Sequence, residues 1–531
     1  MPLGVPGLLT VLWAAFTLAM GFLYGGQDRS AQVAASRFSH LLPMDNQLPY
    51  LFARHIQQFG HSGPPIHVGD WLSSDRPPLQ SAFFLAHTLW RMPDSSAQLD
   101  LQVLGTLLQS TWVLGVWAVT LVVTERRSVR ALIVAGSAVC GQVLLNSFYT
   151  WPKLLAAALA LVAVALVLRT DGVRDVVRLP LAAAAAALAY LSHGGAAFAL
   201  LPVAVLAAWQ LLRRRELLRV GTAAVGSALV LLLPWTLYQR FFDPPGDRLL
   251  KWMLADVQPI DARSAAGAVV ERYRGLGVEH VVQNKLSNVE QVWGLPLQSF
   301  PLHASDEIGT VVRFLRGVWF YELIPSFGLL LVLVVGFLGA RRARATELQA
   351  QLRLAGVCCA GVLGWCLLMF GPRTTLTHQG TYAFTLMGAA ILVGVGAMAS
   401  VRATVMVVGL QGLLTLLVYA PLSPEAGVPW METAHVAKQS IVLAIGAGAA
   451  LVVVLGAYSR SRHGSSAAAP RVAHAGAPFA DTASAIVIST LAAAADLGDA
   501  RAPEGTVSLP AARAAADDTA TTGPEGSLDR E

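Results

Sequence analysis

Long apolar blocks divide this sequence, and they constrain its fold more than any other feature. Of its 531 residues 55% are hydrophobic and 13% are charged. The blocks are long enough to cross a hydrocarbon layer of ~30 Å. They begin near residues 5, 101, 131, 152, 179, 195, 219, 317, 354, 382, 403 and 438, which gives roughly twelve crossings of ~20 residues each. The sequence therefore predicts an all-α polytopic membrane protein.

The first block, Leu3 to Leu23, is interpreted as a retained membrane helix. No basic segment precedes it, and Gly25-Gly26 after it is no clear site for a signal peptidase. The four cysteines also lie inside apolar blocks, where small side chains of this kind pack: Cys140, Cys358, Cys359 and Cys366. Neither a disulfide framework nor a Cys-x-x-Cys metal site is expected.

Arginines mark the short connections between blocks and set the expected orientation. They recur in connections that the positive-inside rule assigns to the cytoplasm: Arg126, Arg127 and Arg130; Arg169, Arg174 and Arg178; Arg213, Arg214, Arg215 and Arg219; and Arg341, Arg342, Arg344 and Arg353. This topology explains the formal charge of +6 without a nucleic-acid partner. Alternation then puts both termini in the cytoplasm, and segments 27–100, 147–152 and 239–312 outside it.

The long segments expected outside have compositions that can fold. Segment 239–312 mixes both charge signs with aromatic residues that can bury a small core: Trp252, Tyr273, Trp293 and Phe300. Residues 81–90 are apolar but too short to span, as in a helix that lies in the membrane interface. The spanning domain is therefore assigned to residues 1–460. Residues 461–531 are rich in Ala, Gly, Pro and Ser, which predicts a disordered cytoplasmic tail with at most a weak helix over 485–497.

An acid and a cation lie at the expected outer face of the membrane. Asp45 follows the first membrane helix, and Arg76 precedes the stiff Pro77-Pro78 pair and the interfacial helix. A carboxylate can accept a proton from a hydroxyl group, and a guanidinium can hold the phosphate of a departing lipid carrier. Together they suit glycosyl transfer from a lipid-phosphate donor. The alternative is that Asp45 caps a helix and Arg76 contacts lipid headgroups.

The order of these residues resembles the polyprenyl-phosphate-dependent GT-C glycosyltransferases, above all the aminoarabinose transferases and protein O-mannosyltransferases. Asp45 with Tyr50 and Ala53, followed by Arg76-Pro77-Pro78-Leu79, is similar to the family's Asp-Glu with Tyr and Lys-Pro-Pro-Leu. This chain carries Asn46 in place of the second acid and Arg76 in place of the lysine. Similar stretches continue in order over roughly residues 1 to 400: Ser192-His193-Gly194-Gly195 with Leu201-Pro202, Leu233-Pro234-Trp235, and Thr377-His378-Gln379-Gly380-Thr381-Tyr382.

This resemblance implies a GT-C-like bundle and an inverting, single-displacement transfer. Asp45 would be the general base on an acceptor hydroxyl, while polyprenyl phosphate leaves. The donor would be a polyprenyl-phosphate-linked sugar, and the acceptor a glycolipid, an envelope polysaccharide or a protein on the outer side of the inner (plasma) membrane. The resemblance leaves open whether a divalent cation bridges Asp45 and the phosphate. The departures at Asn46 and Arg76 also leave open a non-catalytic relative that only binds lipid phosphate.

Further polar residues complete the expected site. Lys153, at an outer turn after Trp151, is a candidate phosphate ligand, and the alternative is an ordinary interfacial lysine beside an aromatic belt. His193 and His378 are also candidates, because an ionisable group inside an apolar block is costly, and the alternative for each is a neutral ring bonded to a helix carbonyl. The residues expected to line the substrate cavity are Tyr50, Asp70, Asp75, Trp151 and Tyr382.

Two other interpretations of the sequence, a zinc site and a transporter, compete with the transferase. His55, His61 and His67 recur in one loop, but without cysteines or a His-x-x-x-His spacing they predict no zinc site. The turn 243–248 is expected to be structural, with Pro-Pro and Gly setting the exit from the membrane. A transporter or lipid flippase would also need many helices and intramembrane charges. The ionisable residues gather at one face here, and no repeated halves are visible, so the transferase is favoured.

Overall fold

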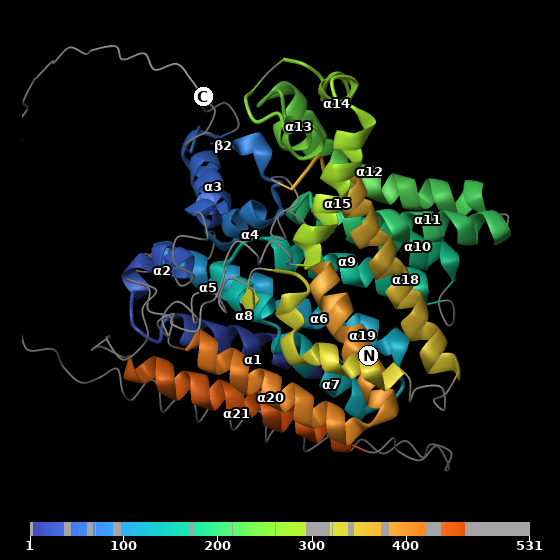
Figure 1. Ribbon diagram of the computed structural model, residues 1–531. Helices are drawn as coiled ribbons and strands as arrows, with labels where there is room; N and C mark the ends of the chain where they lie inside the picture. Colours follow the sequence, from blue (N-terminus) through green and yellow to red (C-terminus); the bar gives the residue numbers. More distant parts are fainter. Residues whose placement is uncertain are drawn as a thin grey trace, which may run out of the picture.

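The part of the protein that the structure describes is helical almost throughout (Figure 1). The computed structural model describes residues 4–36, 44–60, 67–68, 71–88, 97–169, 174–214, 216–260, 262–293, 319–320, 322–337, 345–372, 382–420 and 437–461. Within these, the strands are β1 (His67–Val68) and β2 (Trp71–Leu72), which pair antiparallel with Val68 opposite Trp71. The predicted tail after residue 461 and its weak helix lie outside the described residues.

Eight helices of the described chain are long and apolar enough to cross a membrane. They are α1 (Gly4–Gly21), α5 joined to α6 (Ala97–Ser110 and Trp112–Val123), α10 (Asp175–Ser192), α11 (Ala196–Arg214), α12 (Leu217–Phe241), α18 (Ala345–Leu368), α20 (Val401–Tyr419) and α21 (Lys438–Arg460). The pair α7 (Arg127–Ala138) and α8 (Gly141–Tyr149) is bent by 65° and makes nine if it forms one span. The prediction of a helical polytopic membrane protein is therefore confirmed.

Three predicted blocks form helices that are too short to count as spans. They are α9 (Lys153–Leu168), the 3-10 helix η7 (Pro325–Val335) and α19 (Ala383–Ala399). Most residues of α9 and α19 are buried against other helices. An apolar run in a sequence does not distinguish such a buried bundle helix from a helix that faces lipid. The count of roughly twelve crossings is for this reason not reached in the described residues.

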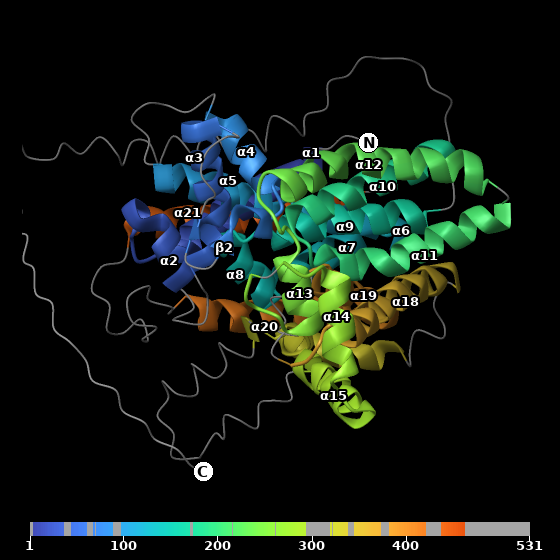
Figure 2. The ribbon, with the colours of Figure 1, turned by 90° about the horizontal axis from the view of Figure 1, so that it is seen from above.

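Small residues let the central helices pack closely. Helix α9 lies between α6 and α10, and α10 lies in turn against α12. A Cβ atom at Gly115 of α6 would come within 2.6 Å of the backbone oxygen of Ala158 on α9, so only glycine fits there. Close backbone approach of this kind is typical of helix contacts in membranes. Figures 1 and 2 show α10, α11 and α12 extending together, away from α1 and α21.

Segment 27–100 folds into short helices next to the ends of the bundle. They are η1 (Gln27–Arg29), α2 (Ser30–Ser36), η3 (Met44–Gln47), α3 (Leu48–Phe59), η5 (Ser73–Asp75) and α4 (Leu79–Thr88). Helix α4 coincides with the predicted interfacial helix, and α3 and α4 pack against each other. This layer carries Asp45 on η3 and places Arg76 directly after η5.

Segment 239–312 forms α13 (Arg248–Ala255), α14 (Ala265–Arg274) and α15 (Val278–Trp293), and residues 294–312 lie outside the described chain. It contacts segment 27–100 through polar bonds. The backbone N–H of Ser74 donates to Asp243 Oδ2 at 2.7 Å, and the Ser73 hydroxyl donates to the same carboxylate. Arg248 Nη1 lies 2.8 Å from Asp75 Oδ2. The turn after α12 therefore fixes the turn that precedes Arg76.

Three arginines of the predicted cytoplasmic connections contact helix ends. Arg178 Nη1 donates to the backbone oxygen of Val167 at 3.0 Å, near the last residue of α9. Arg126 pairs with Glu347 at the start of α18, and Arg127 donates to Ser461 Oγ at 2.5 Å, after the end of α21. Arg178 thus lies at the end of α9 that is opposite Lys153, and Arg126 and Arg127 contact the ends of two other helices.

Candidate active site

A buried acid and a buried cation form the centre of the candidate site. Arg76 Nη2 donates to Asp45 Oδ2 in a salt bridge, and the two residues are 8% and 6% exposed. The Tyr149 hydroxyl, at the end of α8, donates to Asp45 Oδ1 at 3.1 Å. Three segments far apart in the sequence therefore converge on one carboxylate.

The backbone around Arg76 explains how its side chain reaches this point. Arg76 has φ −117° and ψ 119°, in the extended region that a residue before proline prefers because the proline ring crowds the helical conformation. The preceding turn is closed by Asp75, whose Oδ2 accepts from the Leu72 backbone N–H at 2.9 Å and from Arg248. The Asp75–Arg248 pair thus holds the turn that precedes Arg76 and so positions Arg76.

Lys153 brings a second cation to the same cluster. Its Nζ lies 3.8 Å from the ring centroid of Trp151 and 5.7 Å from that of Tyr382. The guanidinium carbon of Arg76 lies 5.7 Å from the same Trp151 ring. Lys153 is 1% exposed, and its Nζ has no hydrogen-bond acceptor among the residues that the structure describes. A buried ammonium group without an acceptor is costly, which is typical of a site that expects an anionic ligand.

The charge balance of the cluster favours an anion. Burial raises the pKa of the Asp45 carboxyl above its ordinary value, and the charges of Arg76 and Lys153 oppose that rise. Two cationic side chains surround one acidic side chain, so the cluster carries an excess of positive charge when all three are ionised. A phosphate fits this set better than a metal ion does, since a divalent cation would be repelled by both Arg76 and Lys153. Over the described ranges, no group of three His, Cys, Asp or Glu side chains is placed to bind a metal.

A pair of buried glutamines holds the turn that presents Trp151 and Lys153. Gln109 Oε1, on α5, accepts from the backbone N–H groups of Leu154 and Leu155 at 3.1 Å each. Its Nε2 donates to Gln80 Oε1 at 3.1 Å, and Gln80 Nε2 donates to the Thr150 backbone oxygen at 2.9 Å. Gln80 lies on α4, one turn after Arg76. The two glutamines therefore link the segment of Arg76 to the segment of Lys153.

We expect Gln109→Leu to destabilise the fold. The leucine would leave two N–H groups of the first turn of α9 without an acceptor, and each buried, unpaired group costs about 1–3 kcal/mol. Gln58→Leu makes the same change at an exposed position of α3 and is the matched control. Thermal unfolding in lipid nanodiscs measures both. Equal midpoints for Gln109→Leu and wild type would contradict the positioning role.

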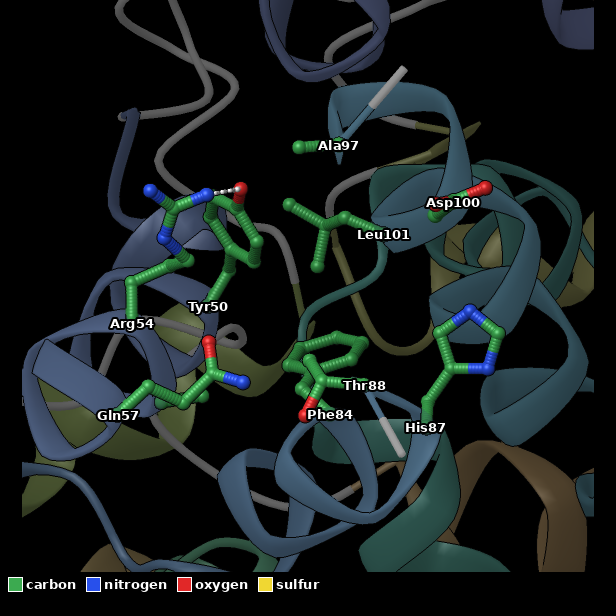
Figure 3. Close-up of a pocket in the computed structure, with 10 residues that line it drawn as sticks. Tyr50, Arg54, Gln57, Phe84, His87, Thr88, Ala97, Asp100 and Leu101 are labelled. Atoms are coloured by element: carbon green, nitrogen blue, oxygen red, sulfur yellow. Dashed lines mark hydrogen bonds between the residues drawn. The ribbon is translucent and has the colours of Figure 1, made fainter. Parts of the chain in front are cut away.

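The other predicted site residues fall into three groups. Trp151 and Tyr382 lie in the cluster, as described above. Tyr50, on α3, packs edge-on against Phe84 of α4, with 6.4 Å between the ring centroids (Figure 3). Both residues line a pocket between α3, α4 and α5. His193 ends α10, where its Nδ1 accepts from the Gly195 backbone N–H at 3.0 Å. Asp70 and His378 lie outside the described residues.

Several residues of the site were not predicted from the sequence. Tyr149 bonds to Asp45, Gln80 and Gln109 hold the Lys153 turn, and Arg248 pairs with Asp75. Gln109 had a visible signal, because a glutamine inside an apolar block must find polar partners in the bundle interior. Arg248 and Tyr149 had none, since their partners lie 173 and 104 residues away in the chain.

In comparisons with protein-family models, with curated proteins and with solved structures, this chain has no significant match. Its function is therefore inferred from the buried cluster and from the chemistry of the side chains in it.

Proposed function

We propose that the protein is a membrane glycosyltransferase that moves a sugar from a polyprenyl-phosphate donor to an acceptor hydroxyl, with inversion. One observation carries the proposal. Asp45, Arg76 and Lys153 come from three separate segments and meet in a buried cluster of one acidic and two basic side chains. A base beside two phosphate-binding cations is the set that this transfer needs.

The ion pair between Asp45 and Arg76 suggests how the donor prepares the base. The donor phosphate binds between Arg76 and Lys153, and Arg76 exchanges the carboxylate for the phosphate. Asp45 loses a stabilising positive charge and becomes a better proton acceptor, since an adjacent cation lowers the pKa of an acid. The bond from Tyr149 keeps the carboxylate oriented during the exchange.

The transfer itself is a balanced single displacement. Asp45 takes the proton of the acceptor hydroxyl, and the acceptor oxygen attacks the anomeric carbon. The bond between that carbon and the phosphate oxygen breaks, and polyprenyl phosphate leaves with the bonding electrons, stabilised by Arg76 and Lys153. The product is inverted at the anomeric carbon because attack and departure occur on opposite faces.

The lipid-linked donor also fits the proposed orientation. With the arginine-rich helix ends in the cytoplasm, the Asp45 cluster lies at the outer side of the inner (plasma) membrane. Nucleotide sugars are not supplied on that side, so a lipid carrier that has crossed the membrane provides the activated sugar. In this arrangement the acceptor is a glycolipid, an envelope polysaccharide or a protein outside the cytoplasm.

A transporter or flippase remains the competing function, and broken helices are the feature that favours it. The α7–α8 bend and the kink of η7 at Gly328 interrupt helices as transporters do around their substrates. Here, however, Thr415 Oγ1 donates to the Val139 backbone oxygen at 2.8 Å, and Gln411 Oε1 accepts from the Leu329 N–H at 2.8 Å. Uncharged side chains of α20 thus form hydrogen bonds with backbone groups at both breaks. Packing between helices therefore accounts for the two interruptions.

A transfer assay tests the proposal. Purified protein in nanodiscs is incubated with envelope extract and radiolabelled sugars, supplied either on polyprenyl phosphate or on a nucleotide. We expect label to enter the acceptor fraction from the lipid donor alone. Transfer from the nucleotide, or none from any lipid donor, would contradict the proposal. Movement of intact labelled lipid across sealed vesicles without transfer would favour the flippase.

A further inference from the structure

Helix α15 carries a stripe of exposed apolar side chains. The stripe consists of Val278, Val282, Leu286, Val289 and Trp293, which are between 37% and 81% exposed. Successive members lie three or four residues apart, so they share one face of the helix. Scattered exposed apolar residues are ordinary on a protein surface, whereas a continuous apolar patch indicates a contact with another molecule or with a membrane.

Polar bonds hold α15 at the end of a candidate spanning helix, α18. Asn288 Nδ2 donates to the backbone oxygens of Cys366 at 2.8 Å and of Met369 at 3.0 Å. Lys285 Nζ also donates to the backbone oxygen of Met369. These oxygens belong to the end of α18, whose apolar span finishes at Leu368, and carbonyls at a helix end need such outside donors. Helix α15 therefore lies level with the end of the span, where the hydrocarbon layer meets the headgroups.

The stripe borders the side of α18 that faces lipid. Leu286 directly follows Lys285 in the helix, so the stripe begins next to the face of α15 that is bonded to α18. On α18, Leu363 and Leu367 are 58% and 62% exposed, and only 33% of the apolar stretch of this helix is buried inside the protein. Figure 2 shows α15 running across the direction of α11 and α12, as a helix in the plane of the membrane does. The stripe therefore continues the lipid-facing surface of α18.

The composition of α15 fits the boundary of a membrane and not its interior. Glu279, Lys285 and Glu290 make the helix too polar to span, and it is not one of the eight candidate spans of the described chain. Trp293 ends the stripe, and tryptophan is enriched where headgroups meet acyl chains. An amphipathic helix of this kind lies in the membrane interface with its apolar face among the acyl chains. We propose that α15 is such a helix and that lipid covers its stripe.

A lipid contact of α15 would hold the segment that touches the candidate active site. Helices α13 and α15 belong to this segment, and Arg248 of α13 pairs with Asp75, which directly precedes Arg76. The Phe370 backbone N–H donates to the Met253 oxygen of α13 at 2.9 Å, so α13 and α15 are bonded to the same end of α18. The inference itself depends on these helices and not on the proposed transfer, so it holds equally for a transferase and for a transporter.

Photo-cross-linking of the full chain tests where the stripe lies. The protein carries p-benzoylphenylalanine at one position and is placed in phosphatidylcholine nanodiscs that contain tritiated phosphatidylcholine. The position is Leu286 in the stripe, Gln283 on the exposed polar side of α15 as the matched control, or Leu363 of α18 as the reference for lipid contact. After irradiation, we expect about tenfold more labelled lipid on the chain from Leu286 than from Gln283, at a level similar to that from Leu363.

Three results would overturn the inference. Equal lipid labelling from Leu286 and Gln283, with strong labelling from Leu363, would place the stripe outside the membrane. A covalent dimer formed from Leu286 would show that a second copy of the chain covers the stripe. A cross-link from Leu286 to another segment of the same chain would show that the chain covers the stripe itself. None of these readouts depends on activity, so failure of the proposed transfer would leave the inference standing.

Discussion

Replacing Asp45 by asparagine is expected to lower the rate of sugar transfer about 10²–10⁴-fold, the range over which a positioned general base contributes to catalysis. The asparagine fills the same volume but accepts no proton. Asp28→Asn, which changes an exposed acid of the same segment, should retain full activity. Transfer rates under single-turnover conditions, with saturating lipid donor, measure the effect. Equal rates for wild type and Asp45→Asn would remove the assigned base.

The same substitution affects stability, and the two effects can be separated. Asp45→Asn leaves the buried Arg76 without its counter-charge, and breaking a buried pair in this way costs about 3–5 kcal/mol. The double variant Asp45→Asn with Arg76→Gln removes both charges and should regain most of that free energy of unfolding. It should nevertheless remain inactive. If transfer returned together with stability in the double variant, the loss in Asp45→Asn would be a folding defect and not a catalytic one.

The apolar blocks of the sequence predicted helices, but they did not distinguish which of those helices span the membrane. Apolar blocks identify spans such as α1 and α21 because lipid-facing helices need long uncharged runs. They also include α9 and α19, which are short and buried on most sides. Hydrophobicity is the same for a helix that faces lipid and for one that faces other helices, so a block count does not by itself give the number of full spans.

The candidate site was predictable as a set of residues but not as a set of contacts. Asp45, Arg76 and Lys153 were selected because charged residues beside apolar blocks are costly and because their order resembles a known family. That Arg76 pairs with Asp45, and that Gln80 and Gln109 join their segments, depends on how distant helices pack. Asp75, which was expected to line the substrate cavity, pairs with Arg248, a residue 173 positions away in the chain. Only the packed structure assigns such partners.

Two equally buried lysines differ in the partners of their ammonium groups. Lys153 and Lys251 are each 1% exposed. Lys251 Nζ lies 2.8 Å from Asp247 Oδ1, whereas Lys153 Nζ has no hydrogen-bond acceptor within the described part of the chain. The first lysine therefore has a structural partner in the protein itself. The second lies against the Trp151 ring and near Asp45, and an anionic ligand would supply the hydrogen-bond acceptor that its ammonium group lacks.

Lys153→Met is accordingly expected to leave the protein as stable as wild type or more stable, by up to about 4 kcal/mol, because it replaces a desolvated charge by an apolar chain of similar length. Lys251→Met should instead cost about 1–3 kcal/mol, since it leaves Asp247 without its partner. Affinity for polyprenyl phosphate should fall about 30-fold in Lys153→Met, which corresponds to about 2 kcal/mol for a lost charged contact. Thermal unfolding and titration with the lipid in nanodiscs measure the two quantities. Strong destabilisation of Lys153→Met with unchanged lipid affinity would make Lys153 a structural residue and would leave Arg76 as the phosphate ligand.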